Sequence, residues 1–114
     1  MEMISTHVLD TSRGRPAKGV PVRLCIRSSR DQWKLLAKGT TNKDGRIPDL
    51  LSKGTKLKKG VYLIIFETAK YFHSTGTKCF YPVVAITFSI QKPRDHYHIP
   101  LLLSPYGYST YRGS

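Results

Sequence analysis

Histidines are the residues of this sequence best suited to acid–base chemistry, because imidazole titrates near neutral pH. Two of the four histidines, His96 and His98, are separated by a single residue. Side chains alternate between the two faces of a β-strand, so in a strand both imidazoles would lie on one face. Such a pair could bind a metal ion or act as proton acceptor and proton donor. Because a zinc site usually has three protein ligands and the sequence nominates no third, we predict acid–base chemistry and no metal.

His7 and Arg46 are further candidates, although each also fits an ordinary structural role. The alternation of the first strand-like segment places His7 on the face of Ser5, where a single histidine is most often a hydrogen-bonded structural residue. Arg46 directly follows the turn-forming pair Asp44-Gly45, from which a long side chain can be aimed. Taken alone, it is typical of a surface charge. The sequence does not by itself bring His7, Arg46 and His98 together.

Other catalytic motifs are absent from the sequence. The two cysteines, Cys25 and Cys79, have neither Cys-x-x-Cys spacing nor an adjacent Cys–His partner, so we expect both to be buried and reduced. There is no Gly-x-Ser-x-Gly nucleophile motif and no glycine-rich loop of the kind that holds a phosphate. We therefore predict that no cofactor is bound.

The composition describes a basic chain of one domain, residues 1–114. Nineteen Lys and Arg residues against seven Asp and Glu residues give a net charge of +12, which would suit nucleic acid or an anionic small molecule. The basic residues are spread along the chain and no nucleic-acid-binding motif is present, so we predict no nucleic-acid partner. No apolar run approaches the ~20 residues of a membrane span, and no leader-like segment opens the sequence. We expect a cytoplasmic protein without a membrane partner.

Short segments of alternating apolar and polar residues make up most of the chain, with turn-forming residues between them. The predicted strands are Ile4–Leu9, Val20–Ser28, Trp33–Thr41, Ile47–Leu51, Gly60–Glu67, Val83–Ile90 and a hairpin within His96–Ser114. Gly60–Glu67 is apolar on both faces, which predicts a central strand. Thr68–Thr75 is predicted to form one short helix that Thr68 caps and that ends before Gly76. This pattern indicates an all-β sandwich.

The last nineteen residues are predicted to form two strands joined by the turn Ser104–Gly107. One face of the first strand carries His96 and His98, and the opposite face is apolar or aromatic throughout. The second strand is predicted to continue to Gly113. A polar face with two histidines is found on ordinary solvated edges and also on surfaces that meet a ligand, so the pattern alone leaves both open.

Several segments match, in order, those of a known family. They are Ser5–Asp10, Gly14–Ala17, Thr41–Arg46, Phe80–Pro82 and His96–Pro105, spread over nearly the whole chain. Tyr111–Ser114 matches the tetrapeptide that ends the family's sequences. Together these segments resemble the transthyretin-like 5-hydroxyisourate hydrolases. Arg46, His98 and the tetrapeptide separate these hydrolases from transthyretin, the hormone carrier of the same fold.

The resemblance implies a fold, an assembly and a reaction. The fold would be a transthyretin-like β-sandwich of two four-stranded sheets with one short helix. The assembly would be a homotetramer, a dimer of dimers with its active sites at the dimer–dimer interface. The reaction would be hydrolysis of 5-hydroxyisourate in urate degradation: water attacks the C6 carbonyl and the N1–C6 amide bond opens. The product would be 2-oxo-4-hydroxy-4-carboxy-5-ureidoimidazoline.

The resemblance also assigns roles to individual residues. The implied catalytic residues are His7, Arg46 and His98. The implied substrate-contacting residues are His7, Arg46, Tyr111 and Ser114. The family assigns no such role to His96, although it shares a face with His98. As a hypothesis, one histidine takes a proton from water while the other supplies a proton or hydrogen bond, and Arg46 offsets charge on the carbonyl oxygen.

Two other functions fit parts of the sequence. A transthyretin-like carrier would bind an aromatic anion in the same channel without chemistry, but a polar, titratable lining argues against a carrier for an apolar hormone. A nucleic-acid-binding β-domain is suggested by the net charge alone. Members of the resembled family occur in cytosol, peroxisome and bacterial periplasm. Because the last three residues differ from the peroxisomal signal Ser-Lys-Leu, the cytoplasm is the expectation and the peroxisome the alternative.

Overall fold

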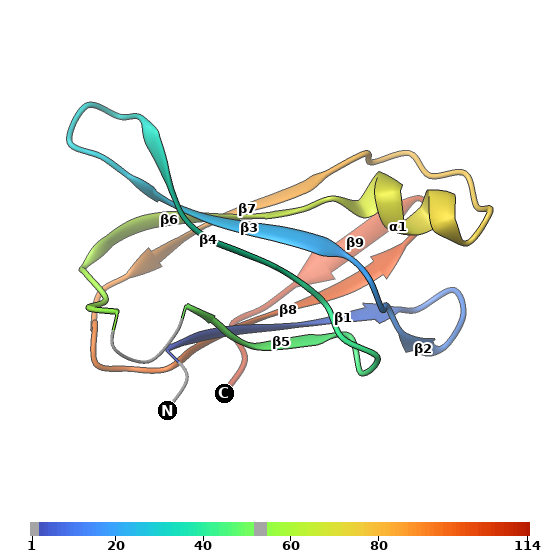
Figure 1. Ribbon diagram of the computed structural model, residues 1–114, viewed down its shortest axis with the longest axis horizontal. Coiled ribbons are helices and arrows are strands. Elements are labelled where there is room, and N and C mark those ends of the chain that lie inside the picture. Colours follow the sequence, from blue (N-terminus) through green and yellow to red (C-terminus); the bar gives the residue numbers. More distant parts are fainter. Residues whose placement is uncertain (1–2, 52–54) are drawn as a thin grey trace.

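Two β-sheets packed face to face form the molecule, and one helix lies at one end of the sandwich (Figure 1). The computed structural model describes residues 3–51 and 55–114. Its elements are β1 (Ile4–Asp10), β2 (Arg15–Pro16), β3 (Pro21–Arg27), β4 (Trp33–Thr40), β5 (Arg46–Leu51), β6 (Gly60–Phe66), α1 (Thr68–Ser74), β7 (Val84–Ile90), β8 (Tyr97–Ser104) and β9 (Gly107–Thr110). One sheet contains β1, β2, β5, β8 and β9, and the other has the order β4-β3-β6-β7.

The first sheet is four strands wide although it contains five strands. The two-residue strand β2 pairs with the end of β1, at Leu9 and Asp10, whereas β5 pairs with β1 between Ile4 and His7. β2 and β5 therefore share one edge of β1, and β8 runs parallel to the other edge over its whole length. The predicted all-β sandwich with one short helix is confirmed, with β2 as a short strand that was not predicted.

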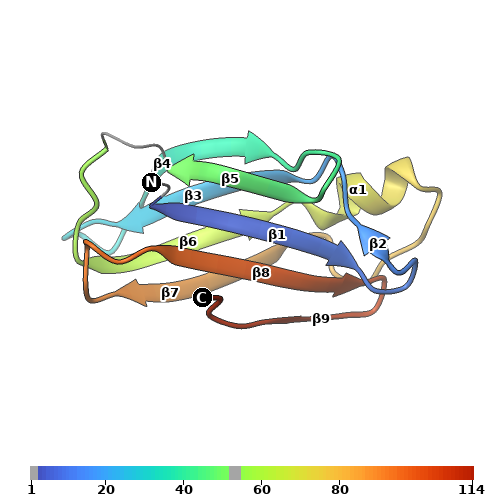
Figure 2. The ribbon, with the colours of Figure 1, turned by 90° about the horizontal axis from the view of Figure 1, so that it is seen from below.

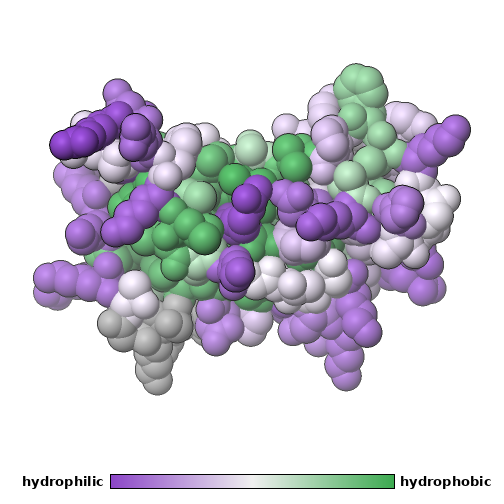
Figure 3. Space-filling view, turned by 45° about the horizontal axis from the view of Figure 1, so that its top comes forward, coloured by the Kyte–Doolittle hydropathy of each residue, from purple (hydrophilic) through white to green (hydrophobic). Residues whose placement is uncertain are grey.

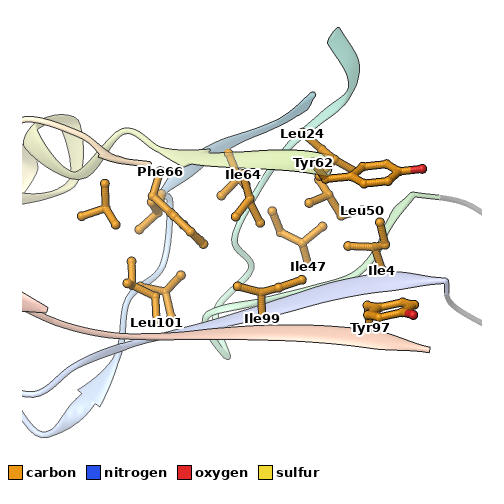
Figure 4. Close-up of a cluster of buried hydrophobic side chains, with 14 of the residues drawn as sticks. Ile4, Leu24, Ile47, Leu50, Tyr62, Ile64, Phe66, Tyr97, Ile99 and Leu101 are labelled. Carbon is orange, nitrogen blue, oxygen red and sulfur yellow. The ribbon is translucent and has the colours of Figure 1, made fainter. Parts of the chain in front are cut away.

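The core lies between the sheets and follows the predicted alternation. On β1, Ile4, Thr6 and Val8 are buried against the second sheet. Figure 4 shows side chains of both sheets meeting in this layer, among them Ile64 and Ile99. Because successive side chains of a strand point to opposite faces, the alternate residues of β1 and β8 must lie on the outer surface of the first sheet.

The second sheet has β6 between β3 and β7, so the prediction that Gly60–Glu67 is central is confirmed. Tyr62, Ile64 and Phe66 are almost fully buried between the sheets. The alternate residues Leu63 and Ile65 are only partly covered, and Figure 3 shows apolar side chains flanked by hydrophilic ones on this side of the molecule. β6 is thus apolar on both faces, although only one of them is fully buried.

The start of the helix differs from the prediction. Thr68 is the first residue of α1 rather than its cap; the N-cap is Glu67, which makes no side-chain capping bond. The Thr68 hydroxyl instead donates to the backbone oxygen of Tyr81 (2.7 Å), so it ties the helix to the segment before β7. Gly76 follows the helix with a φ of 67°, as predicted for a glycine beyond the C-terminus. Across residues 3–51 and 55–114, no helix has the length and apolar character that crossing a membrane would need.

The closing hairpin is shorter than predicted, because β9 ends at Thr110 rather than at Gly113. In the register of β8 and β9, the next residue, Tyr111, stands opposite Pro100, which has no N–H to donate. The chain regains the same register at Gly113, whose N–H donates to the backbone oxygen of His98 (2.8 Å).

The two cysteines are both free thiols, but their burial differs. Cys25 is buried, as predicted. Cys79 is only partly buried, and the prediction for it was wrong, because it lies in the irregular segment between α1 and β7 rather than in a strand.

A buried carboxylate connects the first sheet to the helix. Asp10 accepts hydrogen bonds from the backbone and hydroxyl of Ser12 (3.0 and 2.6 Å) and from the hydroxyl of Tyr71 on α1 (2.7 Å). Burial would raise the pKa of Asp10, but these hydrogen bonds outweigh it and the pKa lies below its ordinary value. Burial and the neighbouring Asp10 raise the pKa of Tyr71 to about 12. Asp10 is therefore charged and Tyr71 is its neutral donor.

We expect Tyr71→Phe to lower the free energy of unfolding by about 1–3 kcal/mol at neutral pH, because a buried carboxylate loses a donor. The lowered pKa of Asp10 means that its stabilisation is complete above the unfolded-state value of 3.8 and is lost as the pH falls through the folded-state value. The difference between the two proteins should therefore shrink in acid. Urea unfolding at neutral pH and below pH 3.8 measures both effects.

Tyr106→Phe is the matched control, because the Tyr106 side chain is 71% exposed. Its free energy of unfolding should change by less than about 0.5 kcal/mol. An equal effect of the two substitutions would contradict the role given to the Tyr71 hydroxyl.

Candidate active site

The parallel pairing of β1 with β8 brings together polar residues that lie more than ninety positions apart in the sequence. Ser5 stands opposite His98 and His7 opposite Pro100. On the other edge of β1, the antiparallel strand β5 places Arg46 opposite His7. Figure 2 shows β5, β1 and β8 side by side, with the C-terminus beside β8. Two histidines and an arginine thus share the outer side of the first sheet.

The turn before β5 fixes the position of Arg46. The side-chain oxygen of Asn42 accepts hydrogen bonds from the backbone N–H groups of Asp44 (2.9 Å) and Arg46 (3.0 Å). Gly45 has a φ of 74°, and a Cβ there would overlap the backbone oxygen of Val8. Only glycine meets both conditions. Asn42 and Gly45 therefore shape the turn from which β5 begins at Arg46.

A cavity of about 240 Å³ lies on this surface. It is lined by Ser5, Thr6, Arg46, Pro48, His96, His98 and Ser114. Of the residues predicted for the site, Arg46, His98 and Ser114 thus line one cavity. His7 neighbours it through its register with Arg46. The volume suits a small molecule with few ring atoms.

Tyr111 is placed elsewhere in the single chain. Its side chain is 60% exposed and lines a separate, more apolar hollow of about 290 Å³ between β7 and β8. His98 and Ile99 also border that hollow, with Phe88 on the opposite sheet. His98 therefore stands between the two hollows, and Tyr111 reaches only the second.

His98 is held from two sides. Its Nδ1 lies 2.8 Å from the Ser5 hydroxyl oxygen, which is also 3.3 Å from Nε2 of His96. The two imidazoles are nearly parallel, with centroids 6.4 Å apart and an interplanar angle of 15°. On the other edge of the His98 ring, a Cβ added to Gly113 would lie 2.5 Å from Cδ2. The backbone at Gly113 is thus in close contact with the ring.

Burial and nearby positive charge keep both histidines neutral. The pKa of His7 is lowered by burial and by Arg46, although a hydrogen bond to the backbone of Asp44 opposes the shift. The pKa of His98 is lowered by burial, by Arg46 and by two further histidines, His96 and His7. A neutral imidazole has one nitrogen with a free electron pair, so each can accept a proton at neutral pH.

Arg46 supplies the positive charge of the cavity. Its side chain is exposed, and within the described parts of the chain it forms no ion pair with a carboxylate. Its five N–H donors are therefore available to an oxygen-rich ligand. In the same described ranges, no group of three or more His, Cys, Asp and Glu side chains is arranged to hold a metal ion.

Ser5, Thr6 and Pro48 line the cavity but were not predicted as site residues. The alternation of β1 places Ser5 on the face of His7. This alternation is the sequence signal from which a place for Ser5 in the site could have been predicted. The importance of Ser5 depends on the partner strand, which periodicity does not reveal.

Comparison with known proteins shows to which family the chain belongs. Residues 4–113 match the HIUase/Transthyretin family. The chain belongs to this family. The 5-hydroxyisourate hydrolase of Mus musculus is 46% identical to it, over 97% of this chain and 94% of the mouse protein.

Two solved structures are similar in fold to this chain. The 5-hydroxyisourate hydrolase of Klebsiella pneumoniae has a TM-score of 0.85 and 39% identity, over 97% of this chain and 98% of that one. Sea bream transthyretin, solved in complex with thyroxine, has a TM-score of 0.90 and 29% identity, over 97% and 94% of the two chains. The predicted transthyretin-like fold is confirmed.

We expect Arg46→Gln to raise the pKa of both His7 and His98, because it removes a positive charge that lowers each of them. The pKa values should stay below 6.5, since burial is the larger cause. Titration of the imidazole proton signals by NMR measures the change. Lys43→Gln, in the exposed turn next to Arg46, is the charge-matched control and should leave both values unchanged. Unshifted histidines in Arg46→Gln would show that the guanidinium does not act on them.

Proposed function

We propose that this protein is an enzyme that hydrolyses 5-hydroxyisourate to 2-oxo-4-hydroxy-4-carboxy-5-ureidoimidazoline. The 46% identity to the mouse hydrolase over nearly the full length supports the proposal. The observation that carries it is the cavity in which the outer residues of β1, β5 and β8 gather neutral imidazole and guanidinium groups. Acid–base groups next to a fixed positive charge are what the hydrolysis of a cyclic amide requires.

The reaction begins with water attacking the C6 carbonyl of the substrate. His7 or His98 takes a proton from the water, and the other supplies a proton or a hydrogen bond. General acid–base catalysis of this kind contributes about 10²–10⁴-fold to the rate. Arg46 binds the oxygen-rich substrate through paired hydrogen bonds and offsets the negative charge that develops on the carbonyl oxygen. The N1–C6 bond then breaks and the ring opens.

Tyr111 and Ser114 are proposed to contact the substrate. Ser114 lines the cavity in the single chain. Tyr111 faces the neighbouring hollow, so its contact would require an assembled oligomer or a turn of its side chain.

We further propose a homotetramer, a dimer of dimers whose active sites lie at the dimer–dimer interface. Within the described strands, β7 and β9 each pair on one side only. Unpaired strand edges of this kind are used to extend sheets between subunits. The cavity lies on the outer face of the first sheet, where a facing subunit could close it. The cytoplasm remains the predicted location, with the peroxisome as the alternative.

We expect His98→Asn to slow the hydrolysis of 5-hydroxyisourate by about 10²-fold or more, because a proton acceptor is lost. The ultraviolet decay of freshly generated 5-hydroxyisourate measures the rate. His73→Asn is the matched control, since His73 is exposed on α1, and it should be as active as wild type. A wild-type rate in His98→Asn would end the assignment of His98. If the wild-type protein did not accelerate the decay, the proposed function itself would fail.

Arg46→Ala should lose most of the activity and keep the oligomer, because Arg46 is exposed and borders the cavity rather than the core. The decay assay and size-exclusion chromatography measure the two properties separately. A fully active Arg46→Ala variant would contradict the role of the guanidinium.

A second candidate is a carrier that binds an aromatic anion, as the likeness to a thyroxine-bound transthyretin suggests. The cavity is lined mainly by polar and charged side chains, whereas an apolar hormone needs a largely apolar site. A calorimetric titration with thyroxine, run beside the decay assay, distinguishes the two functions.

A further inference from the structure

The ring of His98 is held along both of its edges, and the two contacts come from opposite ends of the chain. On the Nδ1 edge is the hydroxyl of Ser5, in β1, at 2.8 Å. On the Cδ2 edge is the backbone of Gly113, so close that an added Cβ would lie 2.5 Å from Cδ2 and 3.2 Å from Cγ. With both edges occupied, the ring has one orientation, and Nε2 is the nitrogen left for a ligand.

The Ser5 hydroxyl lies between two imidazoles and has only one proton to donate. Its oxygen is 2.8 Å from Nδ1 of His98 and 3.3 Å from Nε2 of His96. One consistent arrangement has His98 donating its Nδ1–H to Ser5 and Ser5 donating its O–H to His96. The reverse arrangement would turn an Nε2–H of His98 outward.

The charge in the cavity favours the first arrangement. Arg46 lines the same cavity as His98 and is positively charged, so an electron pair on Nε2 is attracted to it, whereas an N–H there is repelled.

We propose that Ser5 and Gly113 are positioning residues that hold His98 in the Nδ1-protonated tautomer, so that its Nε2 is the proton acceptor of the reaction. In this arrangement His96 accepts a hydrogen bond from the Ser5 hydroxyl. This acceptor fixes the direction of both hydrogen bonds, from His98 to Ser5 and from Ser5 to His96. The inference deepens the proposed hydrolase function and rests on it for its catalytic part.

With Nε2 of His98 as the proton acceptor, each proton transfer of the hydrolysis has a donor and an acceptor. Nε2 of His98 takes a proton from water, and the oxygen of that water forms a bond to C6. The N1–C6 bond breaks, the proton held on Nε2 passes to N1, and His98 returns to its neutral form. Throughout this step Nδ1–H stays bonded to Ser5, so neither Ser5 nor His96 changes its protonation.

The first test reads the tautomer directly and needs no substrate. Proton–nitrogen correlation spectra of the full-length protein, labelled in its histidines, show which ring nitrogen of His98 carries the proton, and the His98→Asn spectrum identifies its signals. We expect Nδ1–H in the wild type and a mixture of tautomers in Ser5→Ala. An Nε2–H tautomer in the wild type overturns the proposal even if the protein is an active hydrolase.

The second test is kinetic. We expect Ser5→Ala to lower kcat by about tenfold, less than the loss of the histidine itself, and to change KM by less than about twofold. Ser5→Thr keeps the hydroxyl and should restore most of kcat. Ser74→Ala is the matched control, because that hydroxyl donates to a helix carbonyl on α1 (2.6 Å). If Ser5→Ala has wild-type kcat and an unchanged tautomer, the proposal is wrong.

The third test concerns the other edge of the ring. Gly113→Ala should lower kcat at least as much as Ser5→Ala, because its Cβ displaces the His98 ring. Gly107→Ala lies in the same C-terminal segment, but there a Cβ would be at an ordinary 3.8 Å from the Ser104 hydroxyl, and activity should be kept. Equal activity of the two variants would show that Gly113 does not position the ring. If the wild type lacks hydrolase activity, the kinetic tests do not apply, and the proton–nitrogen correlation spectra alone test the tautomer of His98.

Discussion

The parallel pairing of β1 with β8 is the constraint on which the site depends. Within the sandwich it is fixed by core packing: Tyr97, Ile99 and Leu101 are buried on one face of β8, and His98 lies between them on the other. A slip of one residue would expose all three and bury the histidine. Burying one such side chain contributes about 1.5–3 kcal/mol, whereas a hydrogen bond on the outer face contributes about 0.5–1.5 kcal/mol. The core therefore determines the geometry of the site, and the site's own contacts adjust it.

The electrostatics of the cavity follow from the same arrangement. Because β5 begins at Arg46 opposite His7, a permanent positive charge stands beside two partly buried imidazoles. Burial, together with this charge, lowers the pKa of His7 and His98, so both imidazoles are neutral at neutral pH. The charge would also attract an anionic substrate and stabilise an oxyanion. In the proposed reaction, Arg46 would thus act both on the histidines and on the charge that forms on the substrate.

Much of the fold could be predicted from the sequence, because the alternation of β1, β6 and β8 specifies which face of each strand is buried. The site could be predicted only in part. Periodicity places Ser5 and His7 on one face, but it does not say which strand lies next to them, and the partner here is some ninety residues away. The resemblance supplied Arg46 and His98 without their geometry. Ser5 was not selected, because its contact with His98 exists only in the parallel register.

A hydrolase and a hormone carrier can share this fold because the buried and outer faces of the first sheet are separate. The sea bream transthyretin has a TM-score of 0.90 with this chain at only 29% identity, so the fold is kept although most residues differ. Ser5, His7 and His98 do not belong to the apolar cluster between the sheets, so these positions can differ while that cluster is kept. Gly113 is different. Its contact with the His98 ring leaves no room for a side chain, so a histidine held in this orientation restricts the backbone beside it as well as its polar partners.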